Sequence, residues 1–135
     1  MKKVYQLLVA LGMCFSGAAS AQVATDGIYS LTVNGSSIGF ATVQSSGSTM
    51  VATLLTTDGS GQPSNWQALI GTNLTGSFST ATVNARFSTV VSGVNATYSV
   101  ILTGTNLTAT QQSCTAKTSL CSFANGTVVF GTKIF

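Results

Sequence analysis

The chain has almost no ionisable side chains, and this scarcity excludes most catalytic and metal-binding chemistry. Its 135 residues include five Lys or Arg, two Asp or Glu and no His. Beyond residue 21 the charged residues are Asp26, Asp58, Arg86, Lys117 and Lys133. General acid–base catalysis usually needs His, Glu or Asp beside the reacting atom, and metal sites need clustered His, Cys or carboxylates. The sequence therefore predicts a protein that is not an enzyme, with no catalytic residues, no metal and no cofactor.

The few charges that remain point to turns rather than to a binding patch. Asp26 and Asp58 each precede a glycine, as turn aspartates do, so we interpret them as turn residues and not as a glycosidase pair. Charged residues make up 5% of the chain, against about a quarter in a usual soluble domain. Because no cluster of basic residues is present, we expect no nucleic-acid partner. Such a surface either stays soluble through hydroxyls and amides or associates with itself, a matrix or a membrane.

The first 21 residues have the pattern of a cleaved bacterial-type signal peptide. A basic start (residues 1–3) precedes an apolar stretch (4–15) and small residues that end in Ala-Ser-Ala at 19–21. Cleavage before Gln22 predicts a single domain over 22–135 that is periplasmic, displayed at the cell surface or secreted. Lipidation at Cys14 is the alternative, but the bulky Met13 fits a lipoprotein site poorly.

Two cysteines follow the signal peptide, and an exported chain usually joins such a pair. Cys114 and Cys121 are therefore predicted to form a disulfide that closes a short loop containing Lys117. A bridge this local stiffens one connection rather than holding the whole fold together. The stiffened loop is either purely structural or a rigid contact tip.

What the chain has in abundance is strand-forming residues separated by turn signals. Val, Thr, Ile, Phe and Tyr are frequent and helix formers are scarce. Alternation predicts strands over 27–33, 37–44, 49–57, 66–70, 96–103 and 128–135. Residues 77–84 and 85–91 form a further strand-prone region, which is either continuous or broken near Asn84. Asn34-Gly35 is a strong hairpin signal. About seven or eight short strands predict an all-β fold, a small antiparallel barrel or sandwich with a mostly up-and-down meander. The meander with one Trp resembles avidin- or lipocalin-like small barrels in fold only, and no family motif accompanies it.

Two groups of residues are candidates for function. Tyr29, Trp66 and Tyr98 are candidate ligand contacts, because aromatic rings either plug a core or line a pocket. The last strand is apolar and strand-prone, and its candidate assembly residues are Val128, Phe130, Ile134 and Phe135. The terminal Phe is typical of outer-membrane barrels. However, Lys133 and Gly131 depart from their apolar pattern and the chain is short for eight spanning strands, so a membrane barrel is disfavoured.

Two functional hypotheses follow from these features. The first is an exported structural or adhesive β-domain that self-associates at the cell surface or in an extracellular matrix. The second is a small β-barrel that binds an apolar molecule inside, or a glycan near Trp66. A cavity lined by the three candidate aromatics would favour the second hypothesis, and an unpaired edge at the last strand would favour the first.

Overall fold

The computed structural model describes residues 24–77, 82–90, 94–116, 121 and 123–135, and these form one closed barrel. The strands are β1 (Gly27–Val33), β2 (Ser36–Ser46), β3 (Thr49–Thr57), β4 (Pro63–Ser77), β5 (Thr82–Thr89), β6 (Val94–Thr103), β7 (Asn106–Ala116) and β8 (Val128–Lys133). The all-β prediction is confirmed, and the barrel is the alternative that holds. The predicted signal peptide (1–21) and Lys117 lie outside the described residues.

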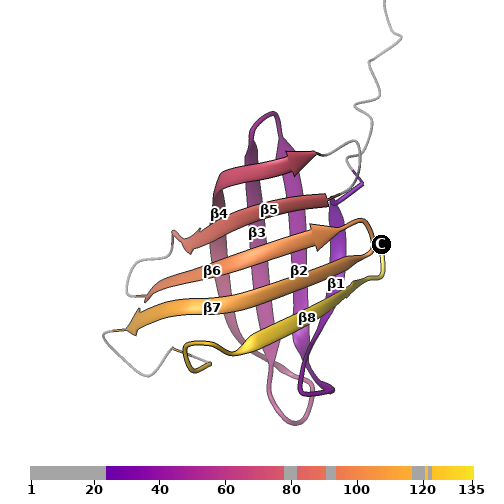
Figure 1. Cartoon of the computed structure of the whole chain (residues 1–135). Coiled ribbons are helices and arrows are strands. Elements are labelled where there is room, and N and C mark those ends of the chain that lie inside the picture. Colours follow the sequence, from indigo (N-terminus) through magenta and orange to yellow (C-terminus); the bar gives the residue numbers. More distant parts are fainter. Residues whose placement is uncertain (1–23, 78–81, 91–93, 117–120, 122) are drawn as a thin grey trace, which may run out of the picture.

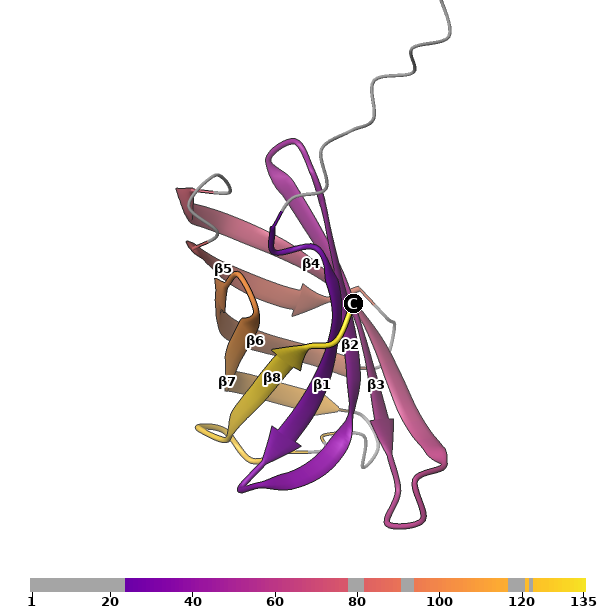
Figure 2. The ribbon, with the colours of Figure 1, turned by 90° about the vertical axis from the view of Figure 1, so that its right-hand side faces the viewer.

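Each strand pairs with the next in antiparallel fashion, and β8 pairs with β1 to close the ring (Figure 1). Figure 2 shows β8 lying between β1 and β7, so both of its edges are paired. Beyond β8, the Ile28 amide donates a hydrogen bond to the Phe135 carbonyl oxygen at 2.9 Å. No helix in the described part of the chain is long and apolar enough to span a membrane.

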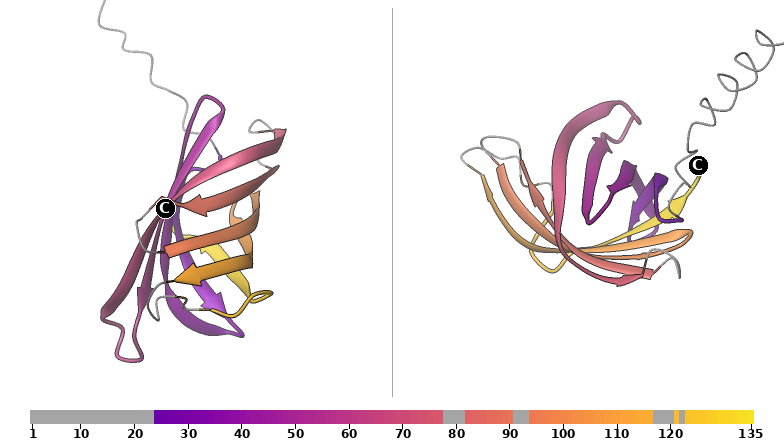
Figure 3. Two further views of the ribbon diagram at one scale, coloured as in Figure 1. Left: turned by 90° about the vertical axis from the view of Figure 1, so that its left-hand side faces the viewer. Right: turned by 90° about the horizontal axis from the view of Figure 1, so that it is seen from above.

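The barrel is flattened, because β5–β8 run across β1–β3 at a steep angle (Figures 1 and 3). β4, the longest strand at 15 residues, belongs to both halves. Its pairing with β5 shifts between Thr72 and Thr75, where Asn73 has a φ of 52° and Gly76 a φ of 104°. Irregularities of this kind bend a strand and let it turn the corner between two crossing sheets.

The barrel interior is a continuous apolar core. Its buried members come from every strand: Tyr29, Leu31, Ala41, Val43, Met50, Leu69, Val83, Ala85, Phe87, Ala96, Tyr98, Val100, Leu102, Leu107 and Val129. Side chains alternate between this core and the outside along each strand, as the pleat requires. In β1, β3 and β6 the apolar residues at every second position, such as Tyr29 and Leu31 in β1, face the core.

The largest departures from the sequence-based strands are in β4 and β7. In addition, β5 covers only 82–89 of the predicted 77–91, Ser77 belongs to β4, and β8 ends at Lys133 rather than at 135. β7 was not predicted, because its inward positions include the small Ala109 and the polar Gln111 and so show little hydrophobic alternation. β4 begins earlier and ends later than the predicted 66–70, since Pro63 can occupy the first position of a strand. Both strands are held by pairing with their neighbours rather than by their own composition.

Candidate functional site

The barrel encloses an apolar cavity of about 50 Å³. It is lined by Leu31, Ala41, Val43, Ala52, Leu54, Leu69, Phe87, Tyr98, Val100, Leu107, Ala109, Phe123 and Val129. All eight strands contribute, and Phe123 is the one lining residue that comes from a loop. Because Leu54 and Phe123 are partly exposed, the cavity reaches the protein surface.

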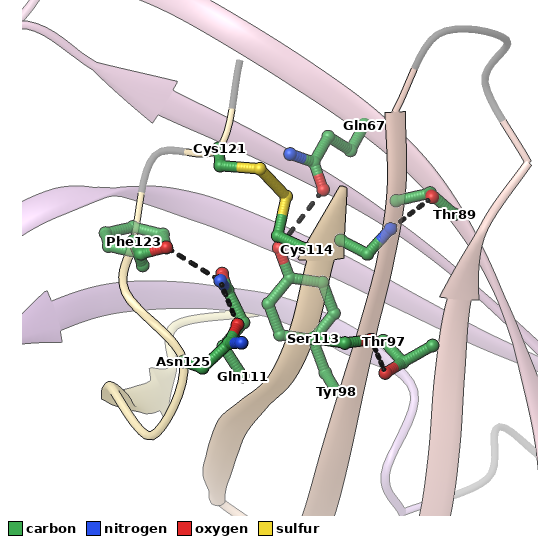
Figure 4. Close-up of a disulfide and its surroundings, with 11 residues drawn as sticks. Gln67, Thr89, Thr97, Tyr98, Gln111, Ser113, Cys114, Cys121, Phe123 and Asn125 are labelled. Carbon is green, nitrogen blue, oxygen red and sulfur yellow. Dashed lines mark hydrogen bonds between the residues drawn. A yellow bond between two sulfur atoms is a disulfide. The ribbon is translucent and has the colours of Figure 1, made fainter. Parts of the chain in front are cut away.

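Two buried polar side chains lie beside this cavity. The Tyr98 hydroxyl donates a hydrogen bond to Gln67 Oε1 at 3.2 Å (Figure 4). Tyr98 comes from β6 and Gln67 from β4, and both are inward-facing. Burial raises the pKa of Tyr98, and the bond to Gln67 opposes part of that shift. Tyr98 therefore stays protonated at neutral pH and is held as a hydrogen-bond donor.

A third buried polar residue anchors the segment that carries Phe123. Gln111 Nε2 donates to the Phe123 carbonyl oxygen at 2.7 Å and to Asn125 Oδ1 at 3.3 Å (Figure 4). The Gln111 backbone also accepts from the Gly126 amide at 2.8 Å and donates to the Thr127 carbonyl oxygen at 3.0 Å. These bonds hold Phe123 over the barrel end at which β7 finishes.

The predicted disulfide lies at the same end of the barrel. Cys114 Sγ and Cys121 Sγ are bonded, with Cα atoms 6.0 Å apart. Cys114 is half-buried against the core near the end of β7, and Cys121 precedes Phe123 by two residues (Figure 4). The bridge and the Gln111 bonds together restrict the segment whose phenylalanine lines the cavity.

The opposite end of the barrel is closed. Tyr29, Met50 and Leu102 are fully buried there, and the Tyr29 hydroxyl donates to the Thr25 carbonyl oxygen at 2.7 Å. Burial, together with the negative charge of Asp26, raises the pKa of Tyr29 to about 12. The N-terminal segment is also fixed by Lys133 Nζ, which donates to the Ala24 carbonyl oxygen at 2.9 Å.

The three candidate aromatics do not share one cavity. Tyr98 lines the cavity, whereas Tyr29 belongs to its closed end. Trp66 lies on the outside of β4 and is 60% exposed. The reason is the period of two along a strand: with Gln67 and Leu69 facing inward, Trp66 must face outward. Sequence reasoning missed Gln67, Gln111 and Phe123, which carry no local signal of burial.

The candidate assembly residues lie on the outside of the barrel. Phe130 is 53% exposed and Phe135 is 78% exposed, while Ile134 is exposed and Val128 is half-buried. The backbone of β8 is nevertheless paired with β1 over residues 130–133 and with β7 over residues 128–132, and Ile134 and Phe135 follow the strand. Any contact through these residues would therefore use side chains rather than added strand pairing.

One sequence pattern associated with catalysis occurs in a structural context that does not fit it. Residues 35–39 read Gly-Ser-Ser-Ile-Gly, the spacing of a nucleophile elbow. Ser37 is exposed in a β-hairpin here, whereas that elbow joins a strand to a helix and works with a His. Among the described residues, no group of three or more His, Cys, Asp or Glu could hold a metal ion.

No protein-family description, curated protein or solved structure matches this chain.

Proposed function

We propose that this protein is an exported, non-enzymatic barrel that binds a slim apolar molecule, such as an alkyl or acyl chain. The cavity carries this proposal, because its lining is apolar and its residues come from all eight strands. Closed barrels of eight strands are wide enough to hold one small ligand. If the interior served only as a packed core, side chains would fill it, whereas this barrel contains a cavity.

The size and lining of the cavity define the ligand class. A volume of about 50 Å³ has room for water, but water needs two to four polar partners and this lining is apolar. An engineered apolar cavity of about 150 Å³ binds benzene. At about a third of that volume, this cavity excludes a ring and takes only a few methylene groups, such as the end of a narrow chain. The chain would enter beside Phe123, since Tyr29 and Met50 close the other end.

The polar pair beside the cavity is satisfied within the protein. The Tyr98 hydroxyl bonds to Gln67 Oε1 at 3.2 Å, and the cavity lining exposes no polar atom. The lining therefore favours an entirely apolar group inside the cavity, with any polar head of the ligand outside it.

The polarity of the two barrel surfaces favours a ligand carrier over a membrane-spanning barrel. Membrane barrels have an apolar outer band and a polar interior. Here the interior is apolar, and the outside of the strands mixes hydroxyls, as at Thr42 and Thr53, with exposed apolar side chains such as Val51 and Ile70.

The test is binding of the fluorescent chain-like probe cis-parinaric acid, whose unbranched acyl end is narrow enough for the cavity, to the purified protein. Ala52→Leu adds an isopropyl group, one methine and two methyls, to the cavity, and Ala68→Leu makes the same change on the outer face of β4. We expect the first variant to bind the probe at least tenfold more weakly, about 1.4 kcal/mol, and the second to bind like wild type. Circular dichroism establishes that both are folded. Absence of probe binding, or equal loss in both variants, would contradict the proposal.

Self-association is the second candidate function, and the exposure of Phe130, Ile134 and Phe135 favours it. Strand addition at β8 is closed off by the pairing with β1 and β7, so association would bury side chains of the outer surface. Light scattering over a concentration series tests this idea. Phe130→Ser together with Phe135→Ser should abolish assemblies without opening the barrel, whereas a wild-type monomer at high concentration would rule it out.

A further inference from the structure

The outer face of β2, β3 and β4 carries an apolar row that the cavity does not use. Phe40 pairs with Leu55, and Leu55 pairs with Trp66, so the three side chains lie side by side across adjacent strands. Phe40 is 41% exposed, Leu55 is half-buried and Trp66 is 60% exposed. With neighbouring strands about 4.8 Å apart, the two aromatic residues are about 10 Å apart. We call these three residues the outer row.

The surroundings of the outer row are neutral and rich in hydrogen-bonding groups. Ser30 of β1 pairs with Phe40. On β2 and β3, Thr42 pairs with Thr53 two residues along from Phe40 and Leu55, on the same face. None of the outward side chains on the described parts of β1–β4 is ionisable. The nearest carboxylate in sequence, Asp58, accepts hydrogen bonds from the Ser60 amide and hydroxyl and from the Gln62 amide, and is occupied within its own loop.

We propose that the outer row binds a neutral polysaccharide, with sugar rings stacked on Trp66 and Phe40. The C–H face of a pyranose ring is apolar and packs on an aromatic face, as other flat apolar groups do. The rim of each sugar ring carries hydroxyls, which match the Ser and Thr hydroxyls around the row. A span of about 10 Å between the aromatics covers more than one ring, so a chain gains contacts that a single sugar cannot.

The chemistry of the face favours this occupant over two others. A charged polysaccharide would find no opposite charge among the outward side chains of β1–β4. A second copy of the chain would have to bury about 800 Å² on each partner, and serine is depleted in such interfaces. The outer row is three residues wide, and Ser30 and the Thr42–Thr53 pair lie beside it. The exposed Val51 and Ile70 pair with each other four residues further along β3 and β4.

The experiment measures retention of the purified protein on insoluble cellulose, chitin and starch. The test variants are Trp66→Ala and Phe40→Ala. Phe130→Ala is the matched control, because Phe130 is an exposed aromatic on the outer face of β8, away from the row. We expect retention on at least one polysaccharide, unchanged in high salt, to fall at least tenfold in both test variants. Phe130→Ala should be retained like wild type.

A second measurement uses the unaltered protein. Trp66 is the only tryptophan of the chain, so its fluorescence reports on this site alone. Hexasaccharides of the retaining polymer should shift or quench that emission, and glucose alone should do so much less. Lack of retention on all three polymers, or equal retention of Trp66→Ala and wild type, would overturn the proposal. So would a Trp66-dependent dimer without polysaccharide binding.

The two sites can be distinguished by one variant. Ala52→Leu fills the cavity from the inner face of β3, and retention on the polysaccharide should be unchanged in it. Absence of probe binding would then contradict the cavity proposal alone. Loss of polysaccharide retention in Ala52→Leu would contradict an outer site that is independent of the cavity.

Discussion

At the closed end of the barrel, the Tyr29 hydroxyl affects stability in two ways: through its hydrogen bond and through its ionisation. These two effects differ in their dependence on pH. Tyr29→Phe removes the hydrogen bond from Tyr29 to the Thr25 carbonyl oxygen, at 2.7 Å, inside a fully buried site. Leaving a buried acceptor without its donor costs about 1–3 kcal/mol. At pH 8 we therefore expect the variant to be less stable than wild type by about 2 kcal/mol.

At high pH the stabilisation that the same hydroxyl gives to the folded protein decreases. Burial and the charge of Asp26 raise the pKa of Tyr29 to about 12, whereas an unfolded tyrosine ionises near 10. The unfolded state therefore loses its proton first, so the stability contribution of this group is complete below pH 10 and falls as pH rises towards 12. Each unit of pKa difference corresponds to about 1.4 kcal/mol, and solvent screening reduces this to about 1 kcal/mol by pH 11.

Tyr29→Phe has no proton to lose at this position, so its deficit should shrink from about 2 kcal/mol at pH 8 to about 1 kcal/mol at pH 11. Urea unfolding at both pH values, followed by far-ultraviolet circular dichroism, measures the gap. Trp66 emission is a poor reporter here because the ring is already exposed. Titrations common to both proteins, including that of Tyr98, cancel in the difference. A gap that is absent at pH 8, or that widens at pH 11, would refute the reasoning.

Two further predictions concern the backbone and the crosslink. Replacing Cys114 and Cys121 by serine should lower the free energy of unfolding by about 2 kcal/mol, seen as a lower urea midpoint, because the bridge closes a loop of seven residues in sequence separation. Gly39→Ala should destabilise by more than about 2 kcal/mol, since Gly39 has a φ of 137° and an added Cβ would overlap the Leu55 carbonyl oxygen. Gly59→Ala, which meets nothing within 4 Å, is the matched control, and equal melting temperatures for the two would contradict the strain argument.

Local features of the barrel could be predicted from sequence, because they depend on neighbouring residues. Asn34 and Gly35 have φ values of 50° and 80°, the positive pair that a tight hairpin turn needs. The closure of the ring could not be predicted. It depends on β1 pairing with β8, roughly a hundred residues later in the chain, and no local pattern encodes that contact.

The candidate site was predicted in part, because both faces of several strands carry apolar residues. Tyr98, predicted to plug the core or to line a pocket, faces the interior, whereas Trp66 faces outward. A shift of one residue in register reverses every side chain of a strand, and the largest apolar residue does not decide the outcome. In β4 the inward positions belong to Gln67 and Leu69, whose polarity and size are less conspicuous.

The interior is too narrow for a large side chain at particular positions, although Tyr29, Phe87 and Tyr98 fit inside elsewhere. In β8 the inward positions are Val129 and Gly131, and a Cβ on Gly131 would already lie 3.0 Å from Leu31 Cδ2. The bulky Phe130 therefore faces outward, and in β2 the small Ala41 faces inward while Phe40 does not. Folding of the barrel alone does not require an aromatic ring at these outer positions. A stability measurement on Phe40→Ala can therefore be compared directly with its polysaccharide retention: unchanged stability with lost retention would assign the ring to binding.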